Sequence, residues 1–214
     1  MNLYRLIVLA HIIIFASIIA AGKCHGSPSN IISDSDFTNQ SYEFENYLKF
    51  YKQFPKNKLT YQEKCIIISA AHYFEISPWV IMAKLQNESD LIGNYGGSNR
   101  YEWRKIRAAG YGLKRHFWLG YHPTSPGKYK FYKYGGYQIQ VFHMAKLLRK
   151  SFDAWTPGKT IKLLCTDEII IPLNASTYAI LVYNPFYYKH EKYGYPSTGS
   201  LLFEQLFNKY KGLK

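Results

Sequence analysis

The stretch Ala70–Ile92, AAHYFEISPWVIMAKLQNESDLI, places one glutamate, Glu88, at the end of an otherwise largely apolar run. Ser77 is a favoured N-cap residue, and Pro78 suits the first helical position, where its missing N–H costs nothing. The pattern therefore predicts a mostly buried helix from Ser77 to about Leu91. A carboxylate near the end of such a helix is partly desolvated, which disfavours its charged form and suits a proton donor. The alternative, from spacing alone, is a solvated helix-end glutamate.

The rest of the chain predicts a mainly α-helical fold with long irregular loops and little or no sheet. Thr60 with Glu63 three residues later forms a capping-box pattern at the start of a helix through Ala71. Further helices are expected over residues 42–54, over residues 136–155, and after Asn174 and Gly199. The segment TIKLLC, residues 160–165, fits a short helix or a strand.

Three parts are expected along the 214 residues. Residues 1–22 read as a secretory signal peptide, because Arg5 precedes an apolar run that ends in small residues. An uncleaved leader that associates with a membrane is the alternative. Residues 23–41 are polar and acidic and are predicted to be a flexible linker. Residues 42–214 are predicted to form one domain, expected to be monomeric and either periplasmic or extracellular.

The charge and the cysteine and histidine content of the chain restrict which partners and cofactors are expected. The formal net charge is +13, from 27 basic and 14 acidic residues, so polyanions are attracted to the chain. No nucleic-acid-binding motif is present, which favours anionic cell-wall glycans, although general solubility also explains dispersed lysines. The three cysteines allow at most one internal bridge, and buried thiols are the preferred interpretation for Cys65 and Cys165. No Cys or His pair has zinc-ligand spacing, so neither a metal nor a cofactor is expected.

Two further segments carry candidate binding residues. In YGGYQIQ, residues 134–140, glycines permit close backbone approach and glutamines can bind sugar hydroxyl or acetamido groups. The tyrosines of NASTYAILVYNPF, residues 174–186, can stack on a sugar face or bond a carboxyl group. The candidates are Tyr137, Gln138, Gln140, Tyr178 and Tyr183. Exposed turn glutamines and core tyrosines are the alternatives.

The segment SPWVIMAKLQNES, following AAHYFEI, resembles the signature helix of lysozyme-like glycan hydrolases, which lytic transglycosylases share. The resemblance implies a lysozyme-like helical domain in which Glu88 is the catalytic acid and Ser89 stands beside it. YGGYQIQ resembles the family's Gly-rich stretch that lines the cleft opposite the acid, with Gln140 preferred over Gln138. NASTYAILVYNPF resembles the closing segment, with Tyr183 as the cleft candidate and Asn184 where threonine is commoner.

We therefore expect an exported enzyme that cuts peptidoglycan glycan strands. Ordinary hydrolysis needs a second carboxylate, for which Asp90, Glu102, Asp153 and Asp167 are the candidates. None has a family motif around it, so a one-carboxylate, transglycosylase-like mechanism is favoured. The alternatives are an endo-β-N-acetylglucosaminidase with the same helix motif, a non-catalytic glycan-binding protein, and a basic exported protein that acts on membranes or polyanions.

Overall fold

The computed structural model describes residues 28–55, 57–93, 105, 108–109, 136–164, 166–188 and 199–212. Within them lie seven α-helices: α2 (Asp34–Thr38), α3 (Phe44–Phe50), α4 (Tyr61–Tyr73), α5 (Pro78–Ser89), α7 (Tyr137–Asp153), α8 (Ala175–Tyr183) and α9 (Gly199–Gly212). A 3₁₀ turn, η1 (Tyr51–Gln53), continues α3. The strands are β1 (Ile161–Lys162), β2 (Ile169–Ile170) and the short β3 (Tyr187–Tyr188). The predicted mainly α fold with little sheet is confirmed.

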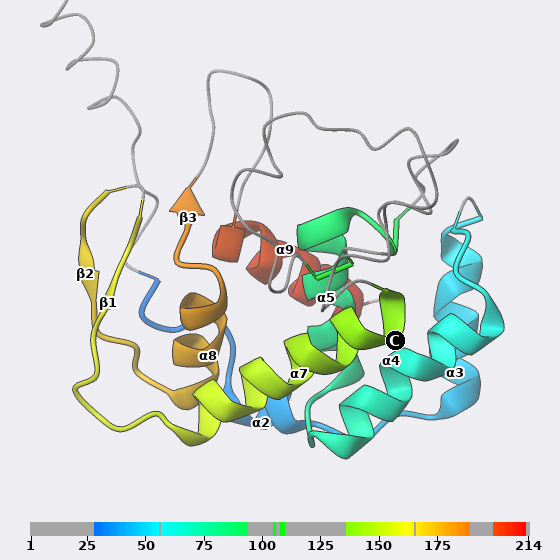
Figure 1. Cartoon of the computed structure of the whole chain (residues 1–214), viewed down its shortest axis with the longest axis horizontal. Coiled ribbons are helices and arrows are strands. Elements are labelled where there is room, and N and C mark those ends of the chain that lie inside the picture. The colour runs from blue at the N-terminus through cyan, green and yellow to red at the C-terminus, as the bar shows by residue number, and fades with distance from the viewer. Residues whose placement is uncertain are drawn as a thin grey trace, which may run out of the picture.

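Helix α5 lies at the centre of this arrangement, with α4, α7 and α9 packed around it (Figure 1). Nine of its twelve residues are buried, as the apolar pattern predicts. It begins at Pro78 after the N-cap Ser77 and ends at Ser89, and the C-cap Asp90 adopts the left-handed backbone conformation at φ 59°. A helix buried on nearly all sides fixes the position of each side chain that it carries.

Aromatic side chains join the helices around α5. The ring of Phe50 on α3 lies 5.2 Å from that of Trp79 on α5 and 5.1 Å from that of Tyr210 on α9, measured between centroids. The capping box predicted at the start of α4 is present, since Thr60 Oγ1 accepts from Glu63 N and Glu63 Oε2 accepts from Thr60 N. Both edge-to-face ring pairs and caps stabilise the bundle locally.

The flexible linker predicted for residues 23–41 is wrong for residues 28–41, which pack onto the domain. Phe37 on α2 is fully buried and stacks on Phe152 of α7 at 4.8 Å between ring centroids. Ile31 and Ile32 are buried in the same core. Their backbone is tied to the start of α8, where Ile31 N donates to Thr177 Oγ1 at 2.8 Å. The polar composition of the segment predicts a linker, but burial of only three apolar side chains, Ile31, Ile32 and Phe37, is enough to anchor it.

Strands β1 and β2 form an antiparallel hairpin in which Ile161 faces Ile170 and Lys162 faces Ile169. The hairpin stands at one end of the molecule, at the left of Figure 1, beside α8. Among the described residues no helix has the length and hydropathy to cross a bilayer. The predicted signal peptide lies outside the residues that the structure describes.

Candidate functional site

Glu88 lies in the last turn of α5, and its side chain is 14% exposed. Two donors reach the same carboxylate oxygen: Lys84 Nζ lies 3.1 Å from Oε1 and Asn184 Nδ2 lies 3.2 Å from it. Within the described part of the chain no hydrogen bond is formed to Oε2. The carboxylate is therefore held through one oxygen, while the other carries no described partner.

Lys84, one helical turn before Glu88, has a fully buried side chain. Its ammonium group lies 4.4 Å from the ring centroid of Tyr183 and 5.8 Å from that of Phe203, so two aromatic faces cover it. Burial lowers the pKa of Lys84, and the neighbouring Glu88 carboxylate opposes that shift. A buried cation of this kind requires a partner charge, which Glu88 supplies.

The end of α8 brings Asn184 to Glu88. Helix α8 starts at the N-cap Asn174, whose side chain accepts from Thr177 N at 2.9 Å, and it ends at Tyr183. Asn184 is then held from α9, because Ser200 Oγ donates to Asn184 O at 2.6 Å. Gly199, at φ 60°, permits this approach, since a Cβ there would collide with the backbone of Phe186. The first turn of α9 therefore fixes the amide that binds Glu88.

Lys105 and the turn residues Ala108 and Ala109 are attached to side chains of four helices. Ser89 Oγ on α5 donates to Ala108 O at 2.6 Å, and the Tyr183 hydroxyl on α8 donates to Ala109 O. The side chain of Gln140, on α7, accepts from Ala109 N at 3.2 Å.

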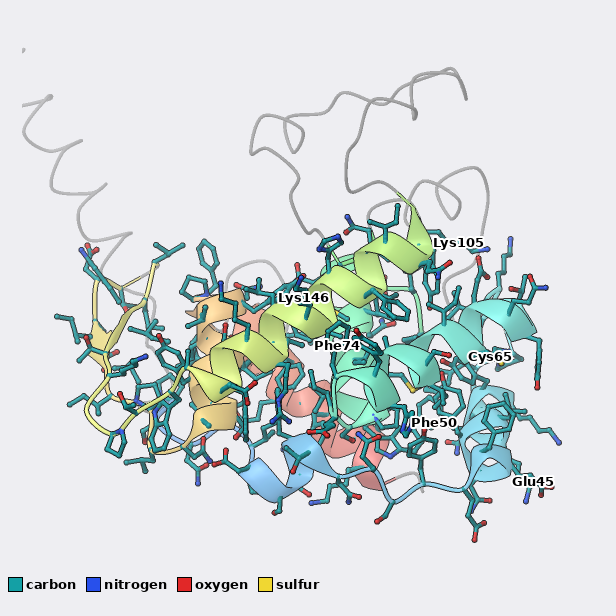
Figure 2. The ribbon with its side chains drawn as sticks, turned by 60° about the horizontal axis from the view of Figure 1, so that its bottom comes forward. Glu45, Phe50, Cys65, Phe74, Lys105 and Lys146 are labelled. Carbon is teal, nitrogen blue, oxygen red and sulfur yellow. The ribbon has the colours of Figure 1, made fainter. Side chains whose placement is uncertain are left out.

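Lys105 supplies the fourth attachment. Its Nζ lies 2.9 Å from Glu63 Oε1 on α4, close to the first turn of α7 (Figure 2). Three of the predicted site residues, Ser89, Gln140 and Tyr183, thus meet on one backbone turn and act as its supports. The short helix expected near this turn lies mostly outside the described residues.

The other predicted site residues form no bond to Glu88 within the described residues. Tyr137, the first residue of α7, is buried, and Gln138 is exposed beside it. Tyr178 is in the first turn of α8, where its ring faces Lys159 Nζ at 5.4 Å. Because α8 rises about 1.5 Å per residue, Tyr178 and Tyr183 are about 7.5 Å apart along the helix axis. Tyr183, at the end of α8, is the tyrosine whose ring covers Lys84, the partner of Glu88. Its predicted role in substrate binding stays a prediction.

Three of the four candidates for a second carboxylate lie among the described residues, and each of them binds a partner other than Glu88. Asp90 Oδ1 accepts from Gln86 Nε2 at the end of α5. Asp153 pairs with Arg149 at 2.9 Å, and Asp167 pairs with Lys162 at 2.8 Å on the hairpin. Glu102 lies outside the described residues. None of the three described candidates bonds to Glu88 or to its partners.

Sequence reasoning missed two residues of the site. Lys84 does not stand out in the sequence, although its spacing of four residues from Glu88 is the spacing of helical ion pairs. The amide of Asn184 was noted only as a departure from threonine. Cys65 is a free thiol but only half-buried, so the predicted burial is not met. Among the described residues no group of His, Cys, Asp or Glu could hold a metal ion.

A surface pocket of about 450 Å³ lies on another side of α5, lined by Ser41, Tyr42, Glu43, Asn46 and Trp79. Trp79 and Glu88 are nine residues apart on the helix, which places them on opposite faces at 100° per residue. This pocket is therefore not part of the Glu88 site.

Comparison with protein-family models, with curated proteins and with solved structures found no match to this chain.

Proposed function

We propose that this protein is an exported enzyme that cuts the glycan strands of peptidoglycan, with Glu88 as the acid that protonates the glycosidic oxygen. The observation that carries the proposal is the Glu88 carboxylate itself. It is 14% exposed and fixed through Oε1 by two donors, and the next residue, Ser89, bonds to the turn residue Ala108. A catalytic group needs such a defined position and a partly dry environment.

In this proposal the reacting proton is carried by Oε2. Lys84 and Asn184 both donate to Oε1, so a proton on the neutral acid is carried by the other oxygen. When this proton moves to the glycosidic oxygen, the C1–O bond breaks and its electron pair stays on the leaving sugar. The two donors then stabilise the carboxylate that remains.

The oxocarbenium-like centre is captured by a nucleophile. We favour the 6-hydroxyl of the same muramyl residue, which forms the new C1–O bond, gives its proton to the Glu88 carboxylate and yields an anhydro product. None of the described carboxylates considered above bonds to Glu88. Water is the alternative nucleophile, and attack by water ordinarily requires a second carboxylate about 5–9.5 Å away. The same cluster also fits an endo-β-N-acetylglucosaminidase, which differs in the sugar on either side of the bond.

The Lys84–Glu88 pair favours one further candidate, a glycan-binding protein without catalysis. A fully buried lysine requires a carboxylate partner for stability, and that requirement alone accounts for a glutamate at this position. The two candidates differ in whether Glu88 is needed for bond cleavage or only for folding.

Digestion of purified sacculi followed by mass spectrometry tests the proposal. Anhydro-muramyl ends identify a transglycosylase, reducing muramic acid a muramidase, and reducing glucosamine a glucosaminidase. We expect Glu88→Gln to abolish product release and the matched change Glu75→Gln, on an exposed side chain of the α4–α5 connection, to leave it intact. Product release by a folded Glu88→Gln protein at the wild-type rate would remove the enzyme proposal.

A further inference from the structure

The hairpin carries an unusual concentration of exposed aliphatic side chains. In the described part of the chain, ten large hydrophobic side chains are exposed, and four of them lie within residues 164–173. These four are Leu164, Ile169, Ile171 and Leu173, with exposed fractions of 60%, 66%, 55% and 66%. We call them the hairpin stripe.

The strand geometry places the stripe on the outer face of the hairpin. Alternate residues of an extended segment point to opposite sides, so Ile169, Ile171 and Leu173 share one side while the buried Ile170 and Pro172 share the other. The neighbouring strand agrees, because Leu163 is fully buried and Leu164 is exposed. The inner face therefore belongs to the core, and the outer face is an apolar surface without a partner in the described chain.

The path of the chain points to the occupant of this surface. Leu173 N donates to Ser29 O at 2.8 Å, so the chain enters the domain directly beside the stripe. The apolar run Leu6–Ala21 ends eight Cα–Cα steps before Ser29. Those steps span at most about 29 Å when fully extended. An uncleaved leader inserted in a bilayer, the alternative to a removed signal peptide, would hold the stripe within reach of the membrane surface.

We propose that the hairpin stripe contacts the surface of an anionic lipid bilayer. Aliphatic side chains enter the boundary between headgroups and acyl chains, and basic residues attract anionic headgroups. Lys162 faces Ile169 across the hairpin but is already paired with Asp167 at 2.8 Å, so the electrostatic attraction comes from the net charge of +13 of the whole chain. This contact is separate from Glu88 and does not depend on the proposed enzyme activity.

Hydrogen exchange of the full chain, with and without vesicles of phosphatidylglycerol and phosphatidylcholine, tests this contact. The apolar run Leu6–Ala21 can itself bind lipid, so the readout is local: amide exchange over residues 161–173. We expect vesicles to slow exchange there. The double variant Ile169→Ser, Leu173→Ser should lose the slowing, with vesicle affinity about tenfold lower for each substitution.

Ile139→Ser is the matched control, because Ile139 is a 41% exposed aliphatic residue on α7, away from the hairpin. It should keep the vesicle-dependent slowing, and circular dichroism should show that all variants are folded. Exchange over residues 161–173 that is unaffected by vesicles overturns the proposal. Slow exchange without lipid, together with a dimer in light scattering that the double variant abolishes, also overturns it and assigns the stripe to a second copy of the chain.

Discussion

Replacing Glu88 by glutamine removes the charge that compensates the buried Lys84 ammonium. Lys84 has a fully buried side chain with Glu88 Oε1 at 3.1 Å. The glutamine oxygen can still accept a hydrogen bond, but it carries no negative charge. We therefore expect Glu88→Gln to lower the free energy of unfolding as well as to remove activity.

The size of this loss follows from the burial of the pair. Removing one partner of a buried ion pair costs about 3–5 kcal/mol, and the remaining acceptor and the partial exposure of residue 88 favour a value near 3 kcal/mol. For a chain of this length each kcal/mol lowers the melting temperature by roughly 2–4 °C, so a fall of roughly 6–12 °C is expected at neutral pH. The double variant Lys84→Met, Glu88→Gln should recover most of that loss, because it leaves no buried charge.

The loss should also depend on pH. Burial already lowers the pKa of Lys84, and Glu88 opposes that shift, so the glutamine variant lowers the pKa further. An unfolded lysine titrates near pH 10.4, so between the folded and unfolded pKa values the unfolded chain holds more protons. Stability therefore rises with pH across this window, and more steeply in the variant than in the wild type.

Thermal unfolding followed by circular dichroism at several pH values between 6 and about 10 measures both effects. The reasoning predicts that the difference in melting temperature between Glu88→Gln and wild type narrows as the pH rises. A Glu88→Gln protein as stable as wild type at neutral pH, with no pH dependence in the difference, would refute it.

Three further predictions concern other parts of the structure. Asn184→Ala removes a donor to Glu88 and should lower kcat/KM on glycan strands by about 10–100-fold, measured with soluble fragments, while the melting temperature changes little. Phe37→Ala should cost about 3–5 kcal/mol in urea unfolding, since the ring is fully buried; a loss near zero would restore the linker interpretation. Ser89→Ala should speed amide exchange at Ala109, because the turn loses its bond to Ala108 O; unchanged exchange there would remove the supporting role.

The sequence was sufficient for the central helix and its carboxylate. Ser77, Pro78 and the apolar run specify α5 locally, so its bounds and the burial of its residues were predictable. The capping pattern of Thr60 and Glu63 specified the start of α4 in the same way. These features depend on neighbours within a few residues, which periodicity and capping rules describe well.

The contacts around Glu88 were not predictable because they join distant segments. Gln140 and Tyr183 were selected for substrate binding, yet both bond to the backbone of Ala109, in a stretch without periodicity. The burial of Lys84 was missed because lysine is rarely fully buried, and only the folded helix pair shows that aromatic rings cover it. The polar composition of residues 28–41 likewise gave no indication that Phe37 anchors this segment in the core.

The attachment of residues 28–38 to α8 affects how the chain folds during its synthesis. Ile31 bonds to Thr177 across 146 positions, and Asp34 bonds to Ser176 across 142. Residues 28–38 are synthesised first, so Phe37 stays uncovered until α7 is made, and Ile31 lacks its partner until α8 is made. Such distant pairing slows folding and lengthens exposure to other chains. We therefore expect the need for chaperones to increase when synthesis of the last third of the chain is slow.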